Sequence, residues 1–232
     1  GTFVEFDKGF DIYATQTFQD EQGRRILIGW MGIPDAEYDN DATVSYDWIH
    51  ALTMPRELSF KDGKLLQKPL KEMQELRKNE FHCALSEFTQ WEPEDSCFEL
   101  HIDFEEKAEK VEKVEIVEII EKERRQQSRS MKLQLREDVI LSLEEGTLRL
   151  NMGKSGRGRK ERATKVEKLR NLTIFSDTSA IEIFINDGET VMTTRVYSEN
   201  LKQKVTFLSK ENTGSVTGYE LGSFIVHHHE EV

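Results

Sequence analysis

Four residues in the N-terminal part of the chain have side chains suited to binding a ligand rich in hydroxyl groups: Asp7, Asp11, Tyr13 and Trp30. Carboxylates such as Asp7 and Asp11 accept strong hydrogen bonds from hydroxyl groups because they are charged. The ring of Trp30 ends an apolar stretch and offers a flat surface against which C–H groups of a ligand can pack. Three of these residues also have a structural interpretation: Asp11 as a turn or capping carboxylate, Tyr13 as a packed ring and Trp30 as a core residue.

Two further motifs carry chemical groups but have simpler interpretations. Residues 155–160 are basic and contain two glycines, and their arginines could bind a phosphate. We expect a solvated hairpin loop there. The three histidines at 227–229 are consecutive, so they do not converge readily on one metal ion, and we expect a flexible tail. Because His50, His82 and His101 lie scattered without ligand spacing, we predict no metal site and no cofactor.

The composition of the 232-residue chain argues against two classes of partner. The formal net charge is −12 and the pI is near 5.1, so the chain repels phosphate backbones and nucleic-acid binding is disfavoured. No stretch approaches about 18 consecutive apolar residues, so we predict no membrane span. The hydrophobic fraction is 37%, and because those residues are patterned we expect a packed core.

The number of cysteines indicates whether the chain is exposed to a reducing or an oxidising compartment. Cys83 and Cys97 are the two cysteines, and no C-x-x-C motif occurs. We interpret them as reduced thiols of a cytoplasmic protein. A disulfide between them would instead indicate secretion.

The elements that must position these residues are strands. Apolar residues alternate with polar ones from Phe98 to Phe104, which is typical of a half-buried strand. Two alternating stretches meet across Glu144-Glu145-Gly146, and two more across Asn186-Asp187-Gly188, where Asp-Gly supplies the positive φ that a tight turn needs. We predict an antiparallel β-sandwich over residues 81–232.

Residues 1–68 form a separate strand-rich unit with turn signals at 20–23 and 61–64. Its spacing suits one four-stranded sheet, the size of a single propeller blade. Residues 69–80 are predicted to connect the two units through a short helix that starts near Pro69. Residues 107–125 fit both a strand at 113–120, favoured by β-branched content, and a charged helix.

Several long motifs resemble one family. These are residues 9–18 (GFDIYATQTF), 23–31 (GRRILIGWM), 51–58 (ALTMPREL) and 172–189 (LTIFSDTSAIEIFINDGE), in that order. They are similar to glycoside hydrolase family 32, the β-fructosidases, and they match the late part of its layout. The resemblance implies an all-β fold: the last blade of a five-bladed propeller followed by an antiparallel β-sandwich.

The resemblance also implies a chemistry that this chain cannot perform alone. The family hydrolyses β-fructosides with retention: one carboxylate attacks the anomeric carbon and a second carboxylic acid protonates the leaving oxygen. Its Trp-Met-Asn-Asp-Pro-Asn, Arg-Asp-Pro and Glu-Cys motifs do not occur here. Residues 30–35 (WMGIPD) only look like the first, and Asp35 is interpreted as a loop residue. We therefore predict no catalytic residues in this chain.

Within the family, the blade residues become candidates for a substrate pocket. Trp30 is expected to pack against a fructosyl ring, and Asp7, Asp11 and Tyr13 to contact sugar hydroxyls. Arg56 and Glu57 are interpreted as a structural ion pair near the closure of the propeller. The sequences of residues 9–14 (GFDIYA) and 28–31 (IGWM) resemble those of bacterial, intracellular members that hydrolyse sucrose-6-phosphate. Free sucrose as the substrate and fructosyl transfer as the reaction are alternatives.

The sandwich has two possible roles. The first is support of the propeller, with subunit contacts in a homo-oligomer. The second is a non-catalytic sugar-binding or subunit-interaction module. Sugar-binding modules usually present exposed aromatic rings on one sheet face, whereas Trp91, Tyr197 and Tyr219 are dispersed here. We therefore favour support.

Overall fold

The computed structural model describes residues 4–105, 130–200, 204–209 and 212–223. Predictions for residues 107–125 and 227–229 lie outside these ranges. The described chain is all-β, with every strand pairing antiparallel, in three sheets. In the described part of the chain, no helix is long and apolar enough to span a membrane.

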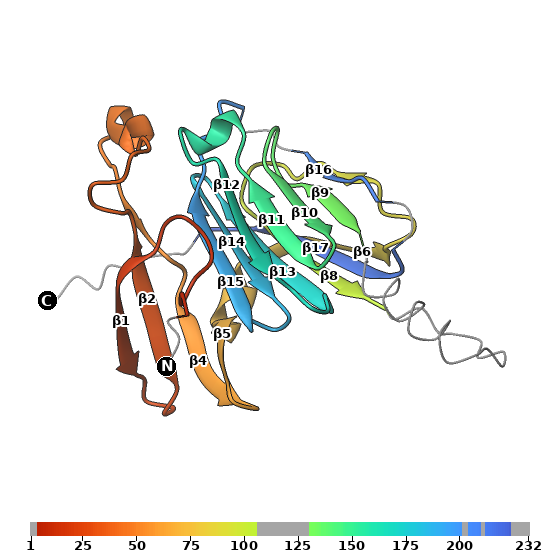
Figure 1. Cartoon of the computed structure of the whole chain (residues 1–232), viewed down its shortest axis with the longest axis horizontal. Coiled ribbons are helices and arrows are strands. Elements are labelled where there is room, and N and C mark those ends of the chain that lie inside the picture. The colour runs from red at the N-terminus through yellow and green to blue at the C-terminus, as the bar shows by residue number, and fades with distance from the viewer. Residues whose placement is uncertain (1–3, 106–129, 201–203, 210–211, 224–232) are drawn as a thin grey trace, which may run out of the picture.

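The first sheet is the blade, coloured red to orange in Figure 1. Its strand order is β1-β2-β4-β5, with the short β3 beside β2, so four main strands are present as predicted. The loop between β2 and β3, here called loop 32–50, contains the 3-10 helix η1. The bounds are β1 Tyr13–Gln19, β2 Arg25–Met31, η1 Asp41–Tyr46, β3 Ala51–Leu52, β4 Arg56–Lys61 and β5 Lys64–Pro69.

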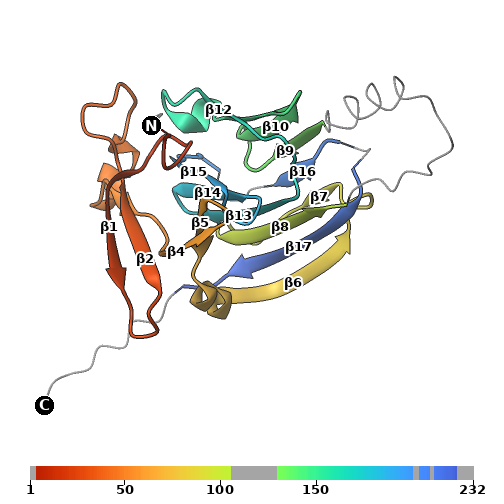
Figure 2. The ribbon, with the colours of Figure 1, turned by 60° about the horizontal axis from the view of Figure 1, so that its bottom comes forward.

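The other two sheets form the sandwich. The inner sheet, nearer the blade, has the order β15-β14-β13-β8-β17-β6, and the outer sheet has the order β12-β11-β10-β9-β16-β7. Figure 2 shows the blade standing beside the two layers. The inner-sheet bounds are β6 Arg77–Ala84, β8 Phe98–Phe104, β13 Asn171–Asp177, β14 Ala180–Ile185, β15 Thr190–Arg195 and β17 Gly214–Leu221; those of the outer sheet are β7 Gln90–Trp91, β9 Met131–Gln134, β10 Ile140–Glu144, β11 Thr147–Asn151, β12 Glu161–Lys165 and β16 Val205–Phe207.

Both predicted hairpins form where the sequence places them. Glu145 and Gly146 have φ of 48° and 66° between β10 and β11, and the turn at 186–188 between β14 and β15 also has positive φ throughout. Two consecutive positive φ values give a turn whose twist matches the flanking strands. The alternating apolar residues then meet in one core between the sheets, where most have no exposed surface.

The inner sheet is buried on both faces near the blade. Ile181, Ile183 and Ile185 of β14 belong to the core between the sheets. Phe184, on the opposite face, packs in a second cluster with Met73 of the connector, together with Phe175 and Val191. Successive residues of a strand point to opposite faces, so Glu182 and Phe184 share the face of β14 that is turned away from the core between the sheets. Both are buried, so this face combines apolar packing with a charged group.

The helix of the connector is shorter than predicted. The helix is the 3-10 helix η2, Lys71–Leu76, and not a helix starting at Pro69. Pro69 pairs with Arg56 as the last residue of β5. The strand register thus holds Pro69 in extended backbone, and the helix begins only after Leu70.

The far side of the blade is open. Every residue of β1 is exposed, and β1 is an edge strand. Among the described residues, all the exposed large apolar side chains except Leu208 lie between Val4 and Leu65. Exposed large apolar side chains are therefore concentrated in the blade and are almost absent from the described part of the sandwich.

Candidate functional site

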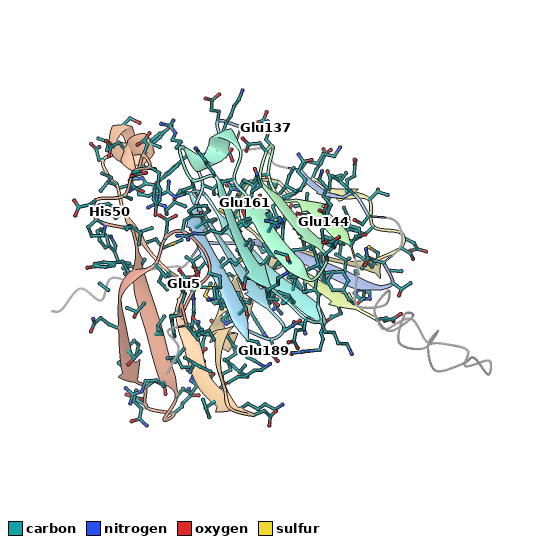
Figure 3. The ribbon with its side chains drawn as sticks, in the orientation of Figure 1. Glu5, His50, Glu137, Glu144, Glu161 and Glu189 are labelled. Carbon is teal, nitrogen blue, oxygen red and sulfur yellow. The ribbon has the colours of Figure 1, made fainter. Side chains whose placement is uncertain are left out.

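Three rings lie in a row on the blade: Tyr13, Trp30 and His50. The Trp30 ring lies 6.0 Å from the Tyr13 ring and 4.6 Å from the His50 ring, both edge-on. Tyr13 is 51% exposed and Trp30 is half-buried. We call these residues the aromatic row; His50 is labelled on the blade in Figure 3. Such a row offers ring faces and edges to the C–H groups of a sugar.

Tyr13 and Trp30 are candidate sugar contacts from the sequence, whereas His50 is not. Tyr13 and Trp30 are directly paired across β1 and β2. His50 reaches them because β3 returns to β2, where Leu52 pairs with Trp30. The local sequence pattern does not predict the contact between His50 and Trp30, because the whole of loop 32–50 separates the two residues.

Asp7 lies in a buried charge cluster between blade and sandwich. Its side chain has no exposed surface. It accepts hydrogen bonds from the backbone N–H of Gly9 at 2.8 Å and from that of Thr193 at 2.9 Å, and from the Thr193 hydroxyl. Arg56 donates to it at 3.2 Å. Asp7 thus binds protein groups and not a ligand, which corrects its prediction as a sugar contact.

Arg56 is the centre of that cluster. Its fully buried guanidinium also donates to Glu182 at 2.5 Å and to Gln67 at 2.9 Å. The structural role predicted for Arg56 is present, but the predicted partner, Glu57, is wrong. Neighbouring residues of β4 point to opposite faces, so Arg56 and Glu57 cannot pair. Burial and the nearby Asp7 carboxylate raise the pKa of Glu182 in spite of Arg56.

Asp11 lies in a second buried cluster. Arg159 donates two parallel hydrogen bonds to the Asp11 carboxylate, from Nε to Oδ2 at 2.7 Å and from Nη2 to Oδ1 at 2.8 Å. The backbone N–H of Arg195 donates to the same carboxylate at 2.7 Å. Neither the Asp11 nor the Arg159 side chain is exposed. The structural alternative for Asp11 is therefore the one its contacts support, and no atom of it is available to a sugar.

Arg159 also corrects the prediction of a solvated loop at 155–160. It is 1% exposed, whereas Arg157 in the same loop has a side chain 42% exposed. The loop packs against the blade, where the Asp39 N–H donates to the Arg157 carbonyl at 3.0 Å. A basic, glycine-bearing loop looks solvated in sequence because the carboxylate it meets lies 148 positions away.

The two clusters share segment 7–11, which runs along the free edge of β15. Lys8 and Phe10 donate backbone bonds to Val191 and Thr193, each at 2.8 Å. The Asp7 and Asp11 carboxylates accept the N–H groups that β15 would otherwise leave unpaired at the edge of the inner sheet. Two aspartates four residues apart thus join the blade to the sandwich.

A cavity of about 340 Å³ lies between the connector and the inner sheet, floored by Met73, Phe175 and Phe184. On its wall, Arg77 forms two bonds to Glu99, each at 2.7 Å. His101 Nε2 lies 2.6 Å from the same carboxylate. Burial raises the pKa of Glu99, but the hydrogen bonds from Arg77 and His101 outweigh burial and hold it below its usual value.

This lowered pKa predicts a loss of stability in acid. A carboxyl whose pKa is lower in the folded state stabilises the protein above its unfolded-state pKa, about 4.3, and that contribution disappears as the pH falls further. Arg77→Met should lower the free energy of unfolding by about 1–3 kcal/mol at pH 7, and by less at pH 3.5. Urea titrations at both pH values measure this. Arg149→Met, which removes an exposed ion pair with Glu161, is the control and should change little at either pH. A pH-independent effect of Arg77→Met would contradict the assignment.

The remaining chemical groups form no metal centre among the described residues, where no group of three or more His, Cys, Asp or Glu side chains is placed to hold an ion. Cys83 and Cys97 are not bonded to each other. Burial raises the pKa of the Cys97 thiol to about 11, which leaves it protonated and unreactive at neutral pH.

The blade and the sandwich match two domains of one known family. The family model "Glycosyl hydrolases family 32 N-terminal domain" matches residues 1–69, and "Glycosyl hydrolases family 32 C terminal" matches residues 64–222. The chain belongs to glycosyl hydrolase family 32. The predicted fold class, one propeller blade followed by a β-sandwich, is confirmed.

Three relatives within this family are sucrose-6-phosphate hydrolases. The chain is 38% identical over 210 residues to the sucrose-6-phosphate hydrolase of Staphylococcus xylosus and 34% over 200 residues to that of Bacillus subtilis (strain 168). Each match covers 85% of this chain but only 39% and 38% of the relative. A solved sucrose-6-phosphate hydrolase from Lactobacillus gasseri superposes with a TM-score of 0.75 at 25% identity, over 94% of this chain and 43% of that one. The chain thus spans less than half the length of these relatives.

Proposed function

We propose that this chain is the C-terminal part of a retaining β-fructofuranosidase that hydrolyses sucrose or sucrose-6-phosphate. The observation that carries the proposal is the family match along almost the whole chain, combined with coverage of less than half of each relative. The family's carboxylate motifs are absent from this sequence, so the carboxylates that cleave the glycosidic bond must come from elsewhere.

In this proposal the blade supplies part of the pocket wall. Trp30 and Tyr13 lie on its open side, where a fructosyl ring can pack against them. The exposed edge of β1 and the apolar residues around it are then the surface on which neighbouring blades pack. Asp35 is not a catalytic candidate, because it is an exposed residue beyond β2 with φ of 60°.

The sandwich supports the blade in this proposal. A sugar-binding module would need exposed rings on one face, but Trp91 and Tyr219 are only partly exposed and Tyr197 is buried. Trp91 packs against Phe81 and Phe98 in the sandwich. We propose the division 1–68 for the blade, 69–80 for the connector and 81–232 for the sandwich, a bacterial cytoplasmic location, and subunit contacts through the sandwich.

Hydrolysis assays test the proposal. The purified chain and a version extended upstream by four propeller blades are each given sucrose and sucrose-6-phosphate, and released hexose is measured. We expect activity only in the extended version. Activity in the short chain would overturn the assignment of catalysis to residues outside it. An extended version that folds but cleaves neither substrate would overturn the proposed reaction.

A further inference from the structure

Two arginines of the sandwich hold loop 32–50 of the blade. Arg159, besides gripping Asp11, donates to the carbonyl of Asp39 at 3.0 Å and to the side chain of Asn40 at 2.5 Å. Its guanidinium also lies over the Tyr38 ring, 4.1 Å from the centroid. A planar guanidinium with five donors can fix several loop groups at once.

Arg195 contacts the chain on both sides of the loop, at Met31 before it and at Ile49 near its end. It donates to the Ile49 carbonyl at 3.2 Å and to the Met31 carbonyl at 3.4 Å, and it lies 5.3 Å from the centroid of the Trp48 ring. Its remaining side-chain bonds go to the carbonyl and hydroxyl of Ser179. In the described part of the chain, no carboxylate pairs with this buried guanidinium. Burial lowers the pKa of Arg195, because a guanidinium removed from water is less stable in its charged form.

The loop carries this constraint to the aromatic row. Ile49, which Arg195 holds, directly precedes His50, whose ring lies edge-on to Trp30 at 4.6 Å. Trp30 in turn touches Tyr13. A continuous series of contacts therefore runs from the sandwich interior to the open face of the blade.

We propose that Arg159 and Arg195 are positioning residues: they fix loop 32–50 so that His50 holds the Trp30 ring in place to receive the sugar. This inference rests on the proposed function. It gives the sandwich a specific task, which is to set the orientation of a ring on the pocket wall. Neither arginine touches substrate.

The first experiment uses this chain alone. Hydrogen exchange of loop 32–50 is compared in wild type, Arg195→Met and Arg157→Met. Arg157 is a matched control, since it lies in the sandwich and forms an exposed ion pair with Asp39 of the same loop. We expect exchange in the loop to accelerate about tenfold in Arg195→Met and to stay unchanged in Arg157→Met. Equal exchange in all three proteins would overturn the proposal.

The second experiment uses the upstream-extended enzyme and separates KM from kcat. Loss of packing against the sugar removes uniform binding, so Arg195→Met and His50→Ala should raise KM for sucrose by about tenfold with little change in kcat. A purely structural role would lower kcat through a smaller folded fraction and leave KM unchanged, which would overturn the proposal. His50 is exposed, so His50→Ala keeps the test valid if Arg195→Met fails to fold.

The two proposals fail in different ways. If the extended wild type cleaves no substrate, the proposed function fails, and the exchange experiment still decides whether Arg195 holds the loop. If the extended wild type is active and both variants keep wild-type KM, the positioning role fails alone.

Discussion

Replacing Arg56 with methionine is expected to lower the free energy of unfolding by about 3–5 kcal/mol. The change leaves two carboxylates, Asp7 and Glu182, buried without their cation. It also removes the donors for Gln67 and Thr193. Urea denaturation followed by near-UV circular dichroism measures the loss.

The control is Lys64→Met. Lys64 also joins blade to sandwich, through Glu189, but its side chain is 59% exposed, so about 0–1 kcal/mol is expected. A second variant tests the cause. Replacing Arg56, Asp7 and Glu182 together with methionine, asparagine and glutamine removes the uncompensated charge, and stability should recover in part. An Arg56→Met protein as stable as Lys64→Met would show that the cluster does not join the two units.

The parts of the fold that sequence predicted are those specified locally. The β10–β11 hairpin needs only alternating apolar residues and a glycine at positive φ, and all of these lie between Ile140 and Asn151. A short turn also joins β1 to β2, the two strand-like stretches predicted on either side of residues 20–23, and it places Tyr13 opposite Trp30. Local signals therefore predicted strands and hairpins, whereas the five-bladed propeller and the candidate sugar contacts Tyr13 and Trp30 came from the family resemblance.

The parts that sequence missed depend on distant partners. The sequence makes Asp7 and Asp11 candidate sugar contacts because carboxylates hydrogen-bond hydroxyl groups well, yet they bind Thr193 and Arg159, 186 and 148 positions further on. Arg157 and Arg159 are the same residue type in one loop, but only Arg159 meets a buried carboxylate. Charge pattern cannot distinguish them, because burial is decided by the packing of two units.

Gly9, the residue between the two aspartates, also depends on a distant partner. A Cβ on Gly9 would overlap the backbone oxygen and nitrogen of Thr193. The obstacle is backbone of the inner sheet, so it cannot rotate away as a side chain would. Segment 7–11 can lie along β15 only because position 9 has no side chain.

Gly9→Ala is therefore expected to lower the free energy of unfolding by roughly 2–5 kcal/mol. Overpacking alone costs about 1–3 kcal/mol, and each buried hydrogen-bonding group left unpaired as the segment shifts adds about 1–3 kcal/mol. The measurement is the urea midpoint, with Lys8→Ala as the control. Lys8 lies in the same segment, but its side chain makes only a 3.6 Å pair with the exposed Glu5, so about 0.5 kcal/mol or less is expected. Because the segment fixes both carboxylate clusters at once, Gly9→Ala should also separate the unfolding of blade and sandwich into two transitions. A single transition at the wild-type midpoint would show that the segment moves aside at no cost, and that the two clusters do not depend on its register with β15.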